Sequence, residues 1–198
     1  MAASLEYLNT VDDEIRRFLC SEPRGGPAGS FVLVTPPTVK EADFGMIVLQ
    51  PDQVHAMSGS NAMCPVTAIL ETGMKEMNEP TTVVSLDTAA GLVRATADCT
   101  AGKVSQVSLE MPPAFVAQKS AIVETPDWGP IRYDLCFGGV FYALLEVEQL
   151  ELSIASEYAR DLATHGVALL HHIKKDAQIV HPETPEINGV AYVMFRSD

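Results

Sequence analysis

The stretch that decides the fold is Met57-Ser58-Gly59-Ser60-Asn61-Ala62-Met63-Cys64, which leads into an apolar run over residues 66–70. It joins a strand predicted over residues 44–49 to a helix predicted to end near Gly73. No Asp, Glu, Lys or Arg lies between Asp52 and Glu71, although the chain is strongly acidic. A turn of small residues that enters a helix leaves backbone N–H groups unpaired at the positive end of the helix dipole. The sequence therefore predicts a binding site for a carboxylate in this stretch.

Three side chains decide how this stretch is interpreted. Ser58 and Ser60 add hydroxyl groups that can bind the same ligand, or one of them can simply cap the helix. Pro65 lies within the expected helix, where a proline lacks the N–H group and clashes with the preceding turn, at a cost of about 3 kcal/mol. Two alternatives follow: either the helix begins at Pro65, because proline is tolerated at the first helical position, or Pro65 lies in the helix interior and destabilises it.

The rest of the chain alternates short strands with two further helices. Thr10 and Asp13 resemble a capping box, which predicts one helix that starts there and ends before Pro23. Short loops within residues 82–111 predict antiparallel hairpins. Strands are predicted over residues 31–35, 44–49, 82–86, 92–97, 104–111, 140–145 and 190–195, and a long helix follows Ser153 or Ser156. This pattern predicts an α+β protein rather than a doubly wound parallel sheet.

The densest cluster of turn-forming residues is Thr125-Pro126-Asp127-Trp128-Gly129-Pro130. Such clusters are typical of boundaries between compact regions. We therefore expect a first domain over residues 1–127, which carries Ser58, and the beginning of a second domain over residues 128–198.

The composition indicates a soluble protein of the cytoplasm. Hydrophobic residues make up 47% of the 198 residues, enough for a core, and no run is long and apolar enough to span a bilayer. No export signal is visible at the N-terminus, so no membrane partner is expected. The net charge of −13 excludes a nucleic-acid partner, because phosphate binding needs a basic face.

Neither the cysteines nor the histidines suggest a metal site. The four cysteines are scattered without a CxxC pair, which disfavours a zinc site or a disulfide framework. Three histidines fall on the long predicted helix at spacings that point their rings in different directions. The residues concerned are Cys20, Cys64, Cys99 and Cys136, and His165, His171 and His172.

Several segments, in the same order, resemble the proline racemase family, which includes hydroxyproline epimerases and trans-3-hydroxyproline dehydratases. The stretch from Met57 to Asn61 resembles the first active-site motif, which usually reads Met-Cys-Gly-His in members that racemise or epimerise. Ser58 stands at the cysteine position and Ser60 at the histidine position. The other similar segments are residues 8–13, 22–25, 86–91, 137–143 and 181–183. The resemblance covers essentially the whole chain and implies that the chain is incomplete at both ends.

The resemblance implies a two-lobed fold like that of diaminopimelate epimerase, in which each lobe is a curled, mostly antiparallel sheet around a central helix. The active site would lie between the lobes, and this chain would supply the first lobe nearly whole and the beginning of the second. The resemblance further implies an enzyme without cofactor or metal that acts on a small proline-type or hydroxyproline-type imino acid. Ser58 would be catalytic, and Gly59, Ser60 and Asn61 would bind the substrate. The resemblance leaves open whether the protein forms a homodimer.

The resemblance also suggests a reaction. The racemases that this chain resembles use two cysteine thiols, one in each lobe, as the acid and the base. A serine hydroxyl is too weak an acid to replace such a thiol, whose ordinary pKa is near 8.5. Dehydration of trans-3-hydroxy-L-proline needs one thiol, because its hydroxyl and its α-hydrogen lie on the same face of the ring. We therefore predict dehydration to a pyrroline-2-carboxylate, with Ser58 hydrogen-bonding the substrate or the departing water. The alternatives are a hydroxyproline 2-epimerase or proline racemase, and an inactive remnant without the second catalytic motif.

Overall fold

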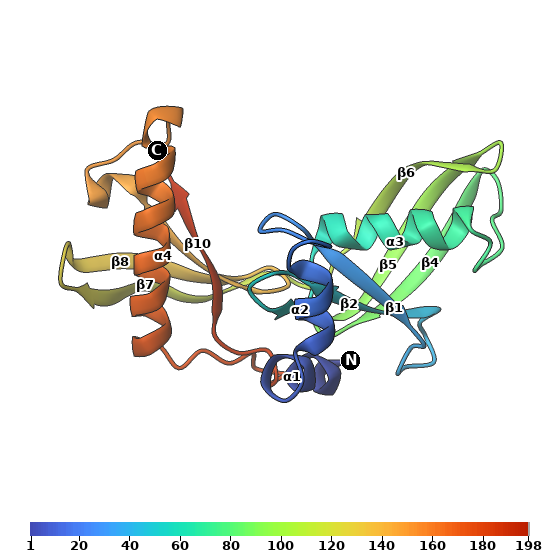
Figure 1. Ribbon diagram of the computed structural model, residues 1–198, viewed down its shortest axis with the longest axis horizontal. Coiled ribbons are helices and arrows are strands. Elements are labelled where there is room, and N and C mark those ends of the chain that lie inside the picture. Colours follow the sequence, from blue (N-terminus) through green and yellow to red (C-terminus); the bar gives the residue numbers. More distant parts are fainter. Residues whose placement is uncertain (198) are drawn as a thin grey trace. The chain divides into compact units, whose positions relative to one another are not determined.

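The computed structural model describes residues 1–197, and the chain divides into two compact units between Pro112 and Pro113 (Figure 1). Each unit has its own sheet and its own helices, so the α+β class predicted from the sequence is confirmed. Among the described helices, none combines the length and the apolar character that crossing a membrane would require.

Unit 1 packs helix α3 against a six-stranded sheet (Figure 1). The strand order is β1-β2-β4-β5-β6, with β3 pairing with β2. Every neighbouring pair is antiparallel except β2 and β4. The elements are α1 (Ala2–Thr10), α2 (Glu14–Cys20), β1 (Phe31–Thr35), β2 (Phe44–Leu49), β3 (Val54–His55), α3 (Gly59–Glu71), β4 (Thr81–Thr88), β5 (Gly91–Thr100) and β6 (Lys103–Glu110).

The core of unit 1 follows from the spacing of apolar residues in α3. Ala62, Val66 and Ile69 recur every three or four residues, so they share one face of the helix, and all three are fully buried. They pack against alternate residues of the sheet, among them Val84 and Val93. Burying these side chains is the main force that holds α3 in place, since a fully buried valine or isoleucine side chain contributes about 1.5–3 kcal/mol.

The N-terminal region differs from its prediction, because two helices, α1 and α2, replace one. Thr10 is the last residue of α1, and its hydroxyl donates to the Glu6 carbonyl (2.8 Å) instead of capping a new helix. Helix α2 begins at Glu14, whose backbone N–H donates to the Asp12 carboxylate (3.0 Å). The predicted capping box is therefore wrong, although an acidic side chain does support the start of α2.

Unit 2 is a four-stranded sheet of order β10-β9-β8-β7 with helix α4 packed against it. The chain crosses from β9 to β10 through α4, and these two strands are parallel. Strand β10 has no strand partner on its other side among the described residues. The elements are β7 (Phe115–Thr125), β8 (Gly129–Phe137), β9 (Phe141–Glu146), two short 3₁₀ helices (Val147–Leu150 and Ser156–Tyr158), α4 (Ala159–Asp176) and β10 (Val190–Arg196).

The boundary expected between residues 127 and 128 falls at a tight turn inside unit 2. Strands β7 and β8 are paired on either side of it, from Thr125 opposite Gly129 onward. The Thr125 hydroxyl closes the turn by donating to the Gly129 carbonyl (2.9 Å) and accepting the Trp128 N–H (3.1 Å). Turn-forming residues mark a hairpin here, and the division between the units lies at the two prolines before β7.

Candidate active site

Helix α3 begins at Gly59, with Ser58 as the residue just before it. The first helical hydrogen bond runs from the Ala62 N–H to the Ser58 carbonyl (3.0 Å). Pro65 lies inside the helix and is buried, so the alternative of an interior proline is confirmed and a helix start at Pro65 is wrong. Packing of the apolar face of α3 against the sheet offsets the cost of this proline.

The N-terminus of α3 presents three backbone N–H groups, those of Gly59, Ser60 and Asn61. Within residues 1–197, none of the three has a hydrogen-bond partner. The positive end of the helix dipole lies behind them. A Cβ added at Gly59 would meet open space, and Ser60 is exposed. The stretch predicted to bind a carboxylate thus has the free donors and the access that such a site needs.

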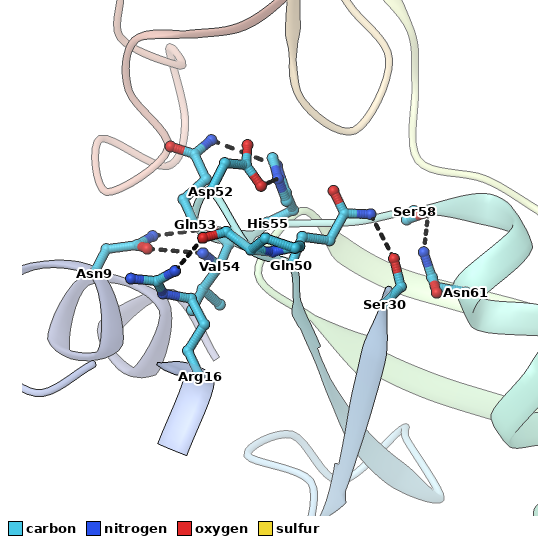
Figure 2. Close-up of polar contacts among 11 residues, drawn as sticks. Asn9, Arg16, Ser30, Gln50, Asp52, Gln53, Val54, His55, Ser58 and Asn61 are labelled. Atoms are coloured by element: carbon cyan, nitrogen blue, oxygen red, sulfur yellow. Dashed lines mark hydrogen bonds and ion pairs between the residues drawn. The ribbon is translucent and has the colours of Figure 1, made fainter. Parts of the chain in front are cut away.

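The Ser58 hydroxyl does not cap the helix. Its oxygen accepts a hydrogen bond from the Asn61 side-chain amide, Nδ2 to Oγ, at 2.9 Å (Figure 2). The hydroxyl hydrogen therefore stays available for another acceptor, and no carboxylate, imidazole or amine contacts Oγ among the described residues. Ser58 and Asn61 are brought together with Gly59 and Ser60 as predicted, and their catalytic and binding roles stay predictions.

A polar cluster supports the segment that leads to Ser58 (Figure 2). His55 in β3 is almost completely buried, and its Nε2 lies 3.2 Å from Oδ1 of Asp52. Gln53 lies on the other side of the ring, with Nε2 3.5 Å from His55 Nδ1. Burial raises the pKa of the Asp52 carboxyl, but the hydrogen bond and the charge of His55 outweigh it, so the pKa lies below its ordinary value. The Asp52 carboxylate is thus ionised near neutral pH, and its contact with His55 holds it in place.

The N-terminal helices contact the same segment. The Asn9 carboxamide bonds both backbone groups of Val54: Oδ1 accepts the N–H (2.8 Å) and Nδ2 donates to the carbonyl (2.9 Å). Arg16 donates from Nη1 to the Pro51 carbonyl (2.5 Å) and from Nη2 to Asp13 (2.7 Å). These contacts could not be predicted from the sequence, because Asn9 and Val54 are 45 positions apart and no local pattern indicates such a pair.

Other clusters do not form a comparable site. No group of three or more His, Cys, Asp or Glu side chains among residues 1–197 could hold a metal ion. A cavity of about 540 Å³ lies in unit 2, and it contains none of the predicted site residues. Its charged lining consists of Arg132, Asp134, Glu146 and Arg196.

Comparison with known proteins supports the family resemblance. The sequence model of the family described as "Proline racemase" matches residues 1–198. The chain is 52% identical to a 4-hydroxyproline 2-epimerase of Rhizobium etli over 198 residues, which is 99% of this chain and 57% of the relative. It is 34% identical to a 4-hydroxyproline 2-epimerase of Streptosporangium roseum over 195 residues, covering 98% of this chain and 59% of the relative.

A solved structure shows the same fold. The crystal structure of a hydroxyproline epimerase from Agrobacterium vitis with bound trans-4-hydroxy-L-proline superposes with a TM-score of 0.92 at 52% identity. The superposition covers 100% of this chain and 58% of that one. The chain therefore spans a little more than half the length of the relatives it matches. On its sequence and on its fold, this chain belongs to the proline racemase family.

Proposed function

We propose that this chain serves the epimerisation of 4-hydroxyproline at its α-carbon, with the Ser58 segment as one side of the active site. The names of its relatives support this reaction, and so does the hydroxyproline bound in the Agrobacterium vitis enzyme. Epimerisation was the alternative in the sequence analysis, and it now stands ahead of dehydration. The observation that carries the proposal is the Asn61–Ser58 hydrogen bond above a free helix N-terminus.

The substrate carboxylate would bind the three free N–H groups of residues 59–61. Each N–H donates to a carboxylate oxygen, and charge-assisted bonds of this kind are stronger than neutral ones. The helix dipole adds a favourable interaction of about 0.3–1 kcal/mol at an exposed helix end. Binding there would place the α-carbon next to the Ser58 hydroxyl, because Ser58 immediately precedes these donors in the chain.

Ser58 would then exchange a proton with the α-carbon. Epimerisation removes the α-proton from one face of the ring and returns a proton to the other face, so one base and one acid are needed. Ser58 Oγ would deliver its proton to one face, while a base on the other face holds the proton it removed. The Asn61 amide and the helix N-terminus both stabilise the negative charge left on Oγ. The reaction moves protons only and needs no redox cofactor.

Dehydration of trans-3-hydroxy-L-proline is the second candidate, and the chemistry of Ser58 favours it. A hydroxyl is a much weaker acid than a thiol, so Ser58 is poorly suited to act as a base in the reverse direction. A single base on the other side could remove the α-proton and protonate the departing hydroxyl, while Ser58 hydrogen-bonds the substrate. The products would be a pyrroline-2-carboxylate and water.

A chimaera tests the two candidates directly. Residues 1–198 of this chain replace the matching part of the Rhizobium etli epimerase, to which they are 52% identical. The chimaera is incubated with trans-4-hydroxy-L-proline and, separately, with trans-3-hydroxy-L-proline in D₂O, and the products are followed by NMR. Deuteration and inversion at the α-carbon of the 4-hydroxy substrate are expected to dominate.

Two variants of the chimaera complete the test. Ser58→Ala is expected to reduce epimerisation by about 10²-fold or more, since loss of a general acid costs roughly that factor. Thr67→Ala is the matched control, because it removes a hydroxyl farther along α3 that bonds only to the Met63 carbonyl (3.2 Å). Conversion of trans-3-hydroxy-L-proline alone would establish dehydration instead. A folded chimaera that turns over neither substrate would contradict both candidates.

A further inference from the structure

The Asn9 carboxamide makes the two backbone hydrogen bonds that a neighbouring strand would make with β3. In an antiparallel ladder, alternate residues direct both backbone groups away from the partner strand. The register of β2 and β3 pairs Val48 with His55 and Leu49 with Val54. At Val54 the outward N–H and carbonyl both meet Asn9, at 2.8 and 2.9 Å (Figure 2). One side chain thus fixes the free edge of a two-residue strand.

A second contact fixes the turn that precedes this strand. The Gln50 N–H donates to the Gln53 carbonyl (3.0 Å), and the turn between them contains Pro51. Arg16 reaches the Pro51 carbonyl from α2, and its side chain is only 13% exposed. Asp13 holds the other end of the guanidinium at 2.7 Å. The turn and the strand are therefore both held by side chains from the N-terminal helices.

The path from these contacts to Ser58 is short and tightly packed. Residues 54–57 are all buried, and Ser58 follows at once in an extended conformation (φ −152°, ψ 124°). Close-packed interiors transmit displacements instead of absorbing them. Movement of Val54 would therefore move Ser58 and the first N–H groups of α3.

We propose that Asn9 is a positioning residue for the Ser58 site, with Arg16 as its second support. Asn9 acts through Val54 and is not assigned a contact with the substrate. This inference rests on the proposed function only for the identity of the ligand; the effect on the geometry of residues 58–61 is independent of it. The N-terminal helices thereby gain a role in the active site, although neither carries a residue assigned to the chemistry.

The test uses the 198-residue chain and four variants. Asn9→Leu removes both contacts with Val54 at nearly constant volume, and Asn9→Asp keeps the acceptor for the N–H and loses the donor to the carbonyl. Arg16→Lys keeps the charge but cannot hold Pro51 and Asp13 together. Thr10→Ala is the matched control, because its hydroxyl bonds only within α1. The readouts are the amide NMR signals of Ser58, Gly59, Ser60 and Asn61, the affinity for pyrrole-2-carboxylate, and the melting temperature.

Asn9→Leu is expected to shift the amide signals of residues 58–61 and to weaken pyrrole-2-carboxylate binding about tenfold, since small misplacements of a binding group are costly. Asn9→Asp and Arg16→Lys should give smaller changes of the same kind, and Thr10→Ala should give none. The proposal is overturned if the Asn9 variants fold and leave these signals and the affinity unchanged. It is equally overturned if Thr10→Ala moves them as much as Asn9→Leu does.

The same experiment separates this inference from the proposed function. A wild-type chain that does not bind pyrrole-2-carboxylate would count against the carboxylate site, while the amide signals would still decide the role of Asn9. If Asn9→Leu does not fold, the comparison of Asn9→Asp and Arg16→Lys with Thr10→Ala decides the question by the same signals. A lower melting temperature with unchanged signals would show that Asn9 only stabilises the fold.

Discussion

Replacing Pro65 with valine should stabilise unit 1. Pro65 lies in the interior of α3 and cannot donate a hydrogen bond to the Asn61 carbonyl one turn earlier. An interior proline costs about 3 kcal/mol relative to alanine, and valine costs up to about 0.7 kcal/mol on the same scale. Removing proline also raises the conformational entropy of the unfolded chain, which reduces the gain in stability by ~0.4–1 kcal/mol. Valine has a similar volume, so the buried face of α3 keeps its packing. The expected net gain is about 1.5 kcal/mol in the free energy of unfolding.

Thermal and urea unfolding, followed by far-UV circular dichroism, measure this gain. For a unit of this size the melting temperature should rise by roughly 5 °C, with an unchanged dependence on urea. The control is Pro37→Val, which removes a proline from the loop after β1, where no helical hydrogen bond can be regained. It should be neutral or slightly destabilising. If Pro65→Val melts at or below the wild-type temperature while the control behaves as expected, the reasoning about the interior proline is wrong.

Three further predictions concern other parts of the chain. Burial raises the pKa of Asp43, but Lys75 and the Ser85 N–H lower it more, so the pKa in the folded protein lies below the ordinary value. The contribution of Asp43 to the free energy of unfolding is therefore lost as the pH falls through this lowered pKa. Asp43→Asn should flatten the acid side of the stability profile, measured by urea unfolding at pH 3 to 6. In the chimaera, Ser58→Cys should speed α-deuteration of 4-hydroxyproline, because a thiol exchanges protons more readily; slower deuteration would refute the assigned proton transfer. The open edge of β10 should promote self-association that sedimentation velocity detects. Met194→Lys, at a position 48% exposed on that strand, should reduce this self-association. An unchanged sedimentation profile would show that the β10 edge is not the contact.

The sequence predicted the central part of unit 1 well, because its signals are local. The apolar spacing after Ser58 gave α3, and the short loops within residues 82–111 gave the β4–β5–β6 hairpins. The sequence left the position of Pro65 open, because the penalty for an interior proline opposes the propensity of its neighbours to form a helix. Packing of Val66 and Ile69 against the sheet outweighs that penalty, and such packing depends on residues distant in the sequence.

The features that were missed depend on distant or irregular contacts. Strand β7 was not predicted, because two irregularities in its pairing with β8, between Val116 and Ala121, break the two-residue alternation that identifies a strand. The hydrogen bond from Asn61 to Ser58 depends on side-chain conformations, which spacing alone does not specify. The Asn9–Val54 contact joins segments 45 residues apart and becomes visible only in three dimensions.

The division at Pro112 has a consequence for the order of events during synthesis. Every strand of the first sheet and every residue of the Ser58 site lies before this point. A ribosome adds roughly 5–20 residues per second, so residues 113–198 take several seconds to emerge. Hairpins form in about 1–10 microseconds, far faster than that. Unit 1 can thus assemble its sheet and the helix start at Gly59 while the rest of the polypeptide is still being made.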